Sequence, residues 1–421
     1  MTGDRPASLR FYAAAADAAA VLAPTWLGRR VRQGKEDAER WRERLGRAGA
    51  ARPGGRIAWL HGVSVGEALS LIPLVARLRS ERPEVGVLFT TGTRASAELI
   101  TARLGASVIH QYAPLDAPAA ARRFLDHWRP EVGVLVESEL WPNLVLAARD
   151  RGVRLALLSA KVSEASLAGW RRVPAAARAV LEAFDLVLAK DERASARLAG
   201  LGARVQGLAD LKFGALPLPV EAVALSSARR AVAGRPVILA ASTHPGEEAP
   251  ILGAFGQAPA EALLIIAPRH SLRGPEVMAL ARDAGLDAGL RTAGDGPGDR
   301  TVLVADTVGE LGLWYRLAAL ALVGGSLRGA GVGGHNPLEP ARLDCPFIAG
   351  AEVASWPVYQ GLEGCGATRT VGSGDLAPWF GRAIRADPSL AEMAARAKAF
   401  VAKGDAAAAD ALDRALRLVP P

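Results

Sequence analysis

The chain has 421 residues, which is too long for one ordinary hydrophobic core and predicts two or three domains. Its net charge of +8 suits an anionic partner, but only 5% of the residues are aromatic and no run alternates basic with aromatic residues, so we expect no nucleic-acid partner. The two cysteines cannot form a disulfide framework or a cysteine-only zinc site, which favours a reducing cytoplasm.

Residues 11–27 are largely apolar and are followed at once by a basic cluster. The apolar run is about 17 residues long, at the lower limit for a bilayer span, and no convincing signal-peptide cleavage region follows it. An apolar helix beside a basic cluster can instead lie in the headgroup region of an anionic membrane. We therefore expect residues 1–34 to associate with a membrane surface; the alternative is a helix packed on its own domain. The cluster consists of Arg29, Arg30, Arg32 and Lys35.

Short apolar runs alternate with helical patterns from residue 57 onward. The expected strands of the first series cover residues 57–61, 85–91, 107–112, 132–137, 155–159 and 186–189. The expected helices cover residues 95–104, 117–127, 143–151 and 192–201, and a further helix follows Glu67. Such alternation is typical of a parallel sheet with helices on both faces. We assign residues 35–208 to this first α/β domain.

A second series of strands and helices starts after a proline-rich segment at residues 213–220. Its expected strands cover residues 237–241, 263–268, 301–305 and 320–324, and residues 406–418 have a helical pattern. We assign residues 209–421 to a second α/β domain that includes this terminal helix. The two doubly wound domains are expected to face each other across a cleft.

The loop between the first strand and its helix reads His61-Gly-Val-Ser-Val-Gly-Glu67. In an α/β domain this loop lies at the carboxyl edge of the parallel sheet, where ligands bind, and Glu67 lies at the first turn of the helix. The carboxylate of Glu67 is therefore a candidate for chemistry. A helix-start residue that is stabilised by the helix dipole would have the same pattern.

Two carboxylates, Glu137 and Glu139, follow the fourth strand with one residue between them. If the end of the strand stays extended, both side chains point the same way and Ser138 points the other way. They are candidate site residues, although loop carboxylates without chemistry fit the motif equally well.

Four loops of the second domain are predicted to meet at one edge of its sheet, because each follows a strand. They cover residues 242–248, 268–270, 306–310 and 324–326. Serine, threonine and glycine at helix starts suit a phosphate, although they are also ordinary helix caps. This edge is where we expect a nucleotide.

A glycine-rich loop follows the strand at residues 320–324 and runs to Asn336-Pro337-Leu-Glu339. Glycine lets backbone N–H groups approach a phosphate closely, and the helix that starts near Asn336 points its positive end at the same place. Glu339 in the first turn is placed to hold ribose hydroxyls. No motif for a divalent metal or a bound cofactor is present, so we expect metal-free chemistry and no cofactor.

Taken together, these motifs resemble the 3-deoxy-D-manno-octulosonic acid (Kdo) transferases of lipopolysaccharide synthesis, and the similarity extends over nearly the whole chain. The resemblance implies the α/β GT-B fold, with two Rossmann-like doubly wound domains and the active site between them. It implies metal-independent, inverting transfer of Kdo from CMP-Kdo to lipid IVA at the cytoplasmic face of the bacterial inner membrane. The segments that carry it are residues 61–67, 137–143, 211–213, 242–248, 268–270, 306–311, 324–327 and 333–339.

The resemblance also assigns roles to individual residues. Glu67 matches the general base that takes the proton of the acceptor hydroxyl, and Glu137 and Lys212 match positions that stabilise the transition state. The segments that match CMP-binding positions contain Pro268, Arg269, Gly309, Glu310, Leu311, Asn336, Pro337, Leu338 and Glu339.

The chain departs from the family pattern after the fifth strand, where Ser159 and Lys161 replace the usual asparagine and arginine. The positive charge is kept, but the bidentate fork of arginine is lost. The loop at residues 328–332 is longer than usual, and residues 350–356 lack the usual Gly-Pro and Asn-Phe pairs. Two other readings remain open: a GT-B enzyme that uses a UDP-sugar, and a scaffold that keeps the fold without catalysis.

Overall fold

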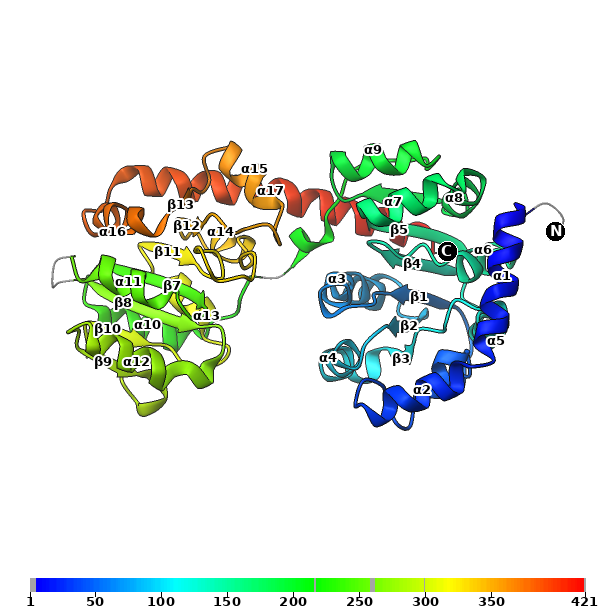
Figure 1. Ribbon diagram of the computed structural model, residues 1–421, viewed down its shortest axis with the longest axis horizontal. Helices are drawn as coiled ribbons and strands as arrows, with labels where there is room; N and C mark the ends of the chain where they lie inside the picture. The colour runs from blue at the N-terminus through cyan, green and yellow to red at the C-terminus, as the bar shows by residue number, and fades with distance from the viewer. Residues whose placement is uncertain (1–4, 216, 258–261, 299, 420–421) are drawn as a thin grey trace. The chain divides into compact units, whose positions relative to one another are not determined.

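Figure 1 shows the computed structural model, which describes residues 5–215, 217–257, 262–298 and 300–419. The chain forms two compact units. Unit 1 contains Met1–Ala215 together with Gly404–Pro421, and unit 2 contains Leu216–Lys403.

Unit 1 is built on a six-stranded parallel sheet with the strand order β3-β2-β1-β4-β5-β6. The strands are β1 (Ile57–His61), β2 (Gly86–Thr91), β3 (Ile109–Tyr112), β4 (Val132–Val136), β5 (Arg154–Ala160) and β6 (Leu186–Ala189). This is the strand order of Rossmann domains, in which ligands bind where the order reverses, here between β1 and β4. The loop after β1 leads to Glu67 in the first turn of the next helix, and Glu137 directly follows β4.

Helices cover both faces of this sheet, as Figure 1 shows. Side chains alternate between the faces along each strand, so Trp59 packs with Phe124 and Trp128 in one core, while Leu60 packs with Leu74 in the other. The helices are α1 (Ala7–Ala20), α2 (Ala23–Arg32), α3 (Val65–Glu81), α4 (Arg94–Leu104), α5 (Pro118–Trp128), α6 (Pro142–Asp150), α7 (Glu164–Arg171), α8 (Pro174–Leu181) and α9 (Glu192–Gly200), with 3-10 turns at Trp41–Leu45, Gly105–Ser107 and Leu211–Gly214.

The end of the chain returns to unit 1, which corrects the assignment of residues 209–421 to the second domain. Helix α17 (Pro388–Leu416) begins in unit 2, but Ala408, Leu412 and Leu416 are buried in the core of unit 1 with Leu60. Leu211 is buried in the same core, so Lys212 also belongs to unit 1. A helical pattern predicts a buried face but does not reveal which sheet that face covers.

Helix α1 packs on unit 1 through one face only. Leu9 is buried in the core, and the Tyr12 hydroxyl donates a hydrogen bond to Asp116 at 3.0 Å. The opposite face leaves Phe11 77% exposed, and at the junction with α2 Val21 and Leu22 are 77% and 70% exposed. The apolar N-terminal segment is therefore both packed on its domain and partly uncovered. Within the described residues, no helix has the length and apolar character that a membrane crossing requires.

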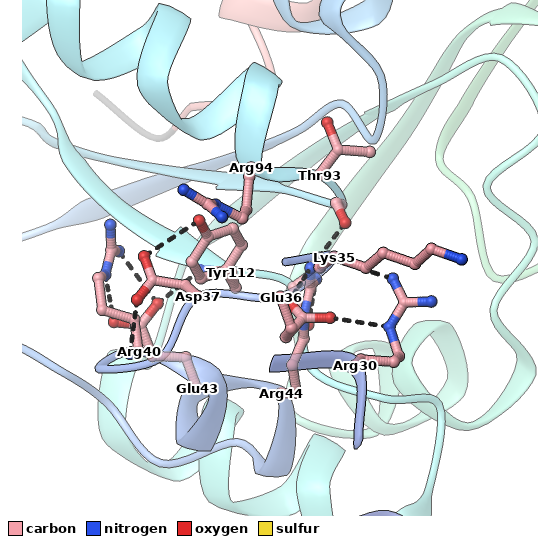
Figure 2. A network of polar contacts seen from close by, with 12 residues as sticks. Arg30, Lys35, Glu36, Asp37, Arg40, Glu43, Arg44, Thr93, Arg94 and Tyr112 are labelled. Carbon is pink, nitrogen blue, oxygen red and sulfur yellow. Dashed lines mark hydrogen bonds and ion pairs between the residues drawn. The ribbon is translucent and has the colours of Figure 1, made fainter. Parts of the chain in front are cut away.

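A polar network fixes the segment that follows α2 (Figure 2). The carboxylate of Glu36 is buried and accepts hydrogen bonds from Arg44 at 2.9 Å and from Arg30 at 3.3 Å. Arg40 and the backbone N–H of Tyr112 bind Glu43 in the same way. Arg30 therefore belongs to the folded domain, whereas the other three members of the basic cluster are exposed.

Unit 2 is built on a seven-stranded parallel sheet with the order β13-β12-β11-β7-β8-β10-β9. The strands are β7 (Val237–Thr243), β8 (Leu263–Pro268), β9 (Ala288–Leu290), β10 (Val302–Val304), β11 (Leu320–Val323), β12 (Phe347–Gly350) and β13 (Thr370–Val371). The sequence predicts β7, β8, β10 and β11 but misses the other three strands, which have only three, four and two residues. The order reverses between β7 and β11, so the loops after these strands form the switch point of this sheet.

The core on one face of this second sheet lies between the strands and the helices on that face. Ile238, Leu264 and Ile266 pack there against Ile251 of α11 and Phe380 of α16. The helices of unit 2 are α10 (Ala222–Val232), α11 (Glu248–Phe255), α12 (Gly274–Asp283), α13 (Leu311–Tyr315), α14 (Leu338–Arg342), α15 (Val358–Gly364), α16 (Leu376–Ile384) and the first part of α17, with 3-10 turns at Ser271–Arg273, Arg291–Ala293 and Ser373–Asp375.

Candidate active site

Glu67 lies in the first turn of α3 and contacts Ser64, the residue that caps this helix. Its Oε2 accepts the backbone N–H of Val63 at 2.8 Å, its Oε1 accepts the Ser64 hydroxyl at 2.8 Å, and its own N–H donates to Ser64 Oγ at 3.4 Å. Glu67 therefore does help to stabilise the start of α3. The carboxylate has about four acceptor positions and uses two of them in these contacts, so it can still accept a further hydrogen bond or a proton. These contacts hold the Glu67 side chain in one orientation at the start of α3.

Glu137 lies at the end of β4 in a left-handed backbone conformation, with φ of 63°. Its carboxylate lies 2.5 Å from Lys161 Nζ and 3.6 Å from Lys212 Nζ. Burial raises the pKa of Glu137, but the hydrogen bond from Lys161 and the charges of Lys161, Lys212 and Lys190 outweigh burial and hold the pKa below its ordinary value. Glu137 is therefore a partly buried carboxylate that stays ionised because lysines lie close to it.

The sheet itself brings these residues together. Glu137, Lys161 and Lys190 are each the first residue after β4, β5 and β6, which are neighbours in the sheet. The Lys161 N–H donates to Glu137 O at 3.2 Å, and the Lys190 N–H donates to Ala160 O at 3.0 Å. Backbone pairing thus continues one residue past the strands and places the three side chains at one edge. The sequence reading did not assign Lys190 to the site; its position directly after a buried strand was the available signal.

Glu139 is held apart from Glu137. Its carboxylate accepts from Trp141 Nε1 and lies 3.2 Å from Nε2 of the buried His61, whose Nδ1 lies 2.9 Å from Thr90 Oγ1. The sequence predicts that Glu137 and Glu139 point the same way only if the end of the strand stays extended. The backbone instead turns at Glu137, so this expectation does not apply. The two carboxylates therefore have different partners, and only Glu137 joins the lysine cluster.

The glycine-rich loop of unit 2 does not offer its first backbone donors to a phosphate, which corrects the prediction from sequence. The buried carboxylate of Glu247 accepts the N–H groups of His244, Gly325, Ser326 and Leu327 at 2.7–3.0 Å. Glu352 accepts those of Gly329 and Gly331 at 3.1 and 3.2 Å. Internal carboxylates occupy the anion site that these donors form. These backbone N–H groups are therefore not free to bind a phosphate.

Arg269 and Glu339 lie near one another at the carboxyl edge of the unit 2 sheet. Pro268 ends β8, and the next residue, Arg269, has an exposed side chain. Glu339 on α14 accepts from Asn336 Nδ2 at 3.4 Å; burial raises the pKa of Glu339, and the Asn336 hydrogen bond and the charge of Arg269 oppose that shift. The Asn336 side chain also accepts the N–H of Leu338 at 3.1 Å, so it caps the helix that Pro337 precedes.

The remaining predicted segment, residues 309–311, lies at the start of α13. Gly309 has φ of 93°, and Leu311 begins the helix. The Glu310 carboxylate pairs with Arg291 at 2.9 Å and also accepts the Thr307 hydroxyl. The hydrogen bond from Arg291 lowers the pKa of Glu310. The Glu310 side chain is therefore paired within the protein, and a ligand at this segment would contact the backbone of Glu310.

The comparisons with known proteins agree with the motifs. Residues 39–215 match the family model described as 3-deoxy-D-manno-octulosonic-acid transferase (kdotransferase). The chain is 40% identical to the 3-deoxy-D-manno-octulosonic acid transferase of Bordetella pertussis over 77% of this chain and 79% of that protein. It is 34% identical to the probable mitochondrial enzyme of that name from Arabidopsis thaliana over 77% and 75% of the two chains.

A solved structure shows the fold. UDP-GlcNAc 2-epimerase from Neisseria meningitidis, bound to UDP-GlcNAc, superposes with a TM-score of 0.57 at 13% identity, covering 86% of this chain and all of that one. The chain has two parallel-sheet α/β units and superposes on this structure, which confirms the GT-B fold predicted from the sequence. At such low identity the likeness concerns the fold alone, whereas the relatives at 40% and 34% identity show the family. The chain belongs to the 3-deoxy-D-manno-octulosonic acid transferase family.

Proposed function

We propose that this protein transfers Kdo from CMP-Kdo to lipid IVA, the phosphorylated lipid A precursor, in lipopolysaccharide synthesis. The observation that carries the proposal is the pairing of Glu137 with Lys161 and Lys212 at the switch point of unit 1, next in the sheet to the strand that leads to Glu67. The family relationship supplies the donor and the sugar. The acceptor, the inversion and the independence from metal are the parts that experiment must decide.

In the proposed reaction, an acceptor hydroxyl attacks the anomeric carbon of Kdo as the bond from that carbon to the CMP phosphate breaks. Glu67 accepts the hydroxyl proton, and CMP leaves with the bonding electron pair. A single displacement of this kind inverts the anomeric centre. The capping contacts of Glu67 leave acceptor positions on its carboxylate for that proton.

Glu137 and its lysines supply charges of both signs at the same edge. An oxocarbenium-like centre is stabilised by a nearby carboxylate, and the lowered pKa keeps Glu137 ionised for that role. The side chains of Lys161 and Lys212 are 41% and 35% exposed, so their ammonium groups can also face anionic groups of a substrate. Cationic side chains can offset the charge of a single leaving phosphate, which is why we propose that no metal is required.

An apolar cavity between α1 and the segment that follows Glu137 supports a lipid acceptor. It has a volume of about 540 Å³, and Tyr12, Trp141 and Trp170 are among the residues that line it. Ser138, the residue after Glu137, lines the same cavity. This size lies within the range of ~300–1,000 Å³ that is usual for small-molecule sites. An acyl chain in this cavity would bring the sugar of a lipid acceptor toward the carboxylate.

The exposed apolar residues of α1 and α2, together with the exposed basic residues near them, support association with the cytoplasmic face of the inner membrane. Trp26 is 50% exposed, and Arg29, Arg32 and Lys35 are exposed beyond it. Apolar contact with the acyl boundary and attraction to anionic lipids act together in such segments.

The decisive experiment incubates the purified protein with lipid IVA and with CMP-Kdo generated in situ, and then measures the mass of the lipid. We expect one or more Kdo units to be added, full activity in the presence of EDTA, and an inverted anomeric configuration by NMR. A matched reaction with UDP-sugars tests the other reading of the fold. Lipid of unchanged mass, or transfer from a UDP-sugar alone, would overturn the proposal.

A further inference from the structure

Two histidines meet at the switch point of unit 2. His244 lies in the loop after β7, and His335 lies in the glycine-rich loop after β11. Their Nε2 atoms are 2.8 Å apart, whereas their ring centroids are 5.1 Å apart and the ring planes differ by 14°. The two imidazoles therefore lie end to end, and one Nε2–H donates a hydrogen bond to the other Nε2.

This hydrogen bond defines the protonation of the pair, because a bond between two Nε2 atoms needs one donor and one acceptor. Burial, then the charges of His244, Arg269 and His270, lower the pKa of His335 to about 4. Burial also lowers the pKa of His244, helped by His270 and Arg269 and opposed by Glu247 and Glu248. Both rings are thus neutral at pH 7 in the protein without ligand.

The surroundings of the pair fit an anion. The exposed side chain of Arg269 and the ring of His270, whose centroid lies 6.0 Å from that of His244, are on the same edge. The first backbone N–H groups of the glycine-rich loop are not available to an anion, because they donate hydrogen bonds to Glu247. Gly325 keeps space for the pair, since a Cβ there would lie 3.0 Å from Nε2 of His335.

We propose that His244 and His335 form a proton-linked anion site that binds the phosphodiester of the CMP-sugar donor. On binding, the pair takes up one proton from solvent. The shared N–H···N bond is then replaced by imidazole N–H groups that donate to phosphate oxygens. The negative charge of the phosphate offsets the repulsion from Arg269 and His270 that keeps the pair neutral without ligand. This inference rests on the proposed function, because it assumes a CMP donor in unit 2.

The test measures proton uptake by calorimetry, with the whole protein titrated in buffers of different ionisation enthalpy. The probe is the methyl ester of CMP, a phosphodiester that does not itself titrate near pH 7; cytidine, which lacks the phosphate, is the matched control ligand. We expect uptake approaching one proton with the ester and none with cytidine. We also expect affinity for the ester to fall by up to about tenfold per pH unit between pH 6 and 8.

His335→Gln and His244→Gln should each abolish the proton uptake, while His270→Gln, at the exposed neighbour, should leave most of it. Since the chain has only six histidines, ¹⁵N NMR of the imidazoles in the unmodified protein gives a second readout that needs no variant. Two rings should become protonated or change tautomer when the ester binds. Binding of the ester without proton uptake or ring changes would overturn this inference alone. Failure of the ester to bind at all would overturn both the inference and the proposed donor.

Discussion

Lys161 Nζ lies 2.5 Å from the carboxylate of Glu137, and the two residues directly follow adjacent strands of one sheet. The family resemblance of the sequence predicts arginine at position 161, where this chain has lysine. The contact shows that the substitution keeps a positive charge on the carboxylate, although a single ammonium replaces the two-pronged guanidinium. The contribution of Lys161 to the proposed reaction can therefore be measured by substitution.

Replacing Lys161 with glutamine should slow transfer by about 10- to 100-fold, equivalent to about 1.4–2.7 kcal/mol in the barrier, because Glu137 loses its nearest counter-charge. Lys161→Arg should retain most of the activity. Steady-state rates with the lipid acceptor provide the measurement. Lys398→Gln, which removes an exposed lysine of unit 2 that pairs with Asp344, is the control. Activity of Lys161→Gln equal to that of the control would show that the contact is only structural.

The pH dependence of the same variant should move in a known direction. The folded-state pKa of Glu137 is lowered, so the stabilisation from its ionised form is present at neutral pH and is lost as the pH falls through that lowered pKa. Without Lys161 the pKa of Glu137 should rise. The acid limb of both the stability and the rate profile should therefore shift to higher pH, as thermal melts and rates from pH 4 to 7 would reveal. An unchanged acid limb would mean that other groups control it.

Glu67→Gln should reduce transfer by about 10²- to 10⁴-fold while leaving the melting temperature nearly unchanged. Glutamine has nearly the same shape as glutamate, and its side-chain amide can still accept the N–H of Val63 and contact the Ser64 hydroxyl, so these contacts can persist. Glu67→Ala is the complementary variant, because it should lose both the base and the cap, and it should melt at a lower temperature. If Glu67→Gln kept turnover within about threefold of the unmodified protein, another residue would have to be the base.

Arg269→Ala should weaken binding of CMP by about 1.5–3 kcal/mol, the range for a hydrogen bond to a charged group. Its side chain is exposed at the edge of the sheet, and its charge affects both Glu339 and His335. Calorimetric titration with CMP gives the affinity, and Arg369→Ala, at another exposed arginine of unit 2, is the control. Equal affinities for the two variants would place the phosphate elsewhere.

The long buried strands could be predicted from the sequence, because β1, β4 and β5 are mostly apolar segments of five to seven residues. β9 and β13, with three and two residues, are too short to show a period. The carboxylate of Glu247 could not be assigned from sequence, since a glutamate before a helix looks the same whether it caps locally or, as here, binds backbone groups 78–80 residues away. Long-range pairing of this kind is determined by the topology of the sheet.

The last prediction concerns the membrane. If α1 and α2 form an interfacial anchor, binding to vesicles should require anionic lipid and should weaken with salt, because each basic side chain near the surface contributes about 1 kcal/mol that ions screen. The structure shows that the four basic residues of the cluster are not equivalent targets for substitution. Arg30 pairs with Glu36 and stacks on Trp26, so its removal would disturb the fold as well as the charge. Arg29, Arg32 and Lys35 are exposed and can be changed to glutamine together.

We expect the triple glutamine variant to bind vesicles containing anionic lipid much more weakly than the unmodified protein, with an unchanged melting temperature. A second variant, with serine at the exposed Phe11, Val21 and Leu22, should lose the apolar part of the binding and keep the salt dependence. Both variants should still bind CMP, since the changes lie in unit 1 far along the chain from the predicted CMP segments. Co-sedimentation with neutral and anionic vesicles at low and high salt gives the comparison. Equal binding to the two kinds of vesicle would refute electrostatic attraction, and unchanged binding by both variants would leave α1 as a piece of the domain that Leu9 and Tyr12 hold in place.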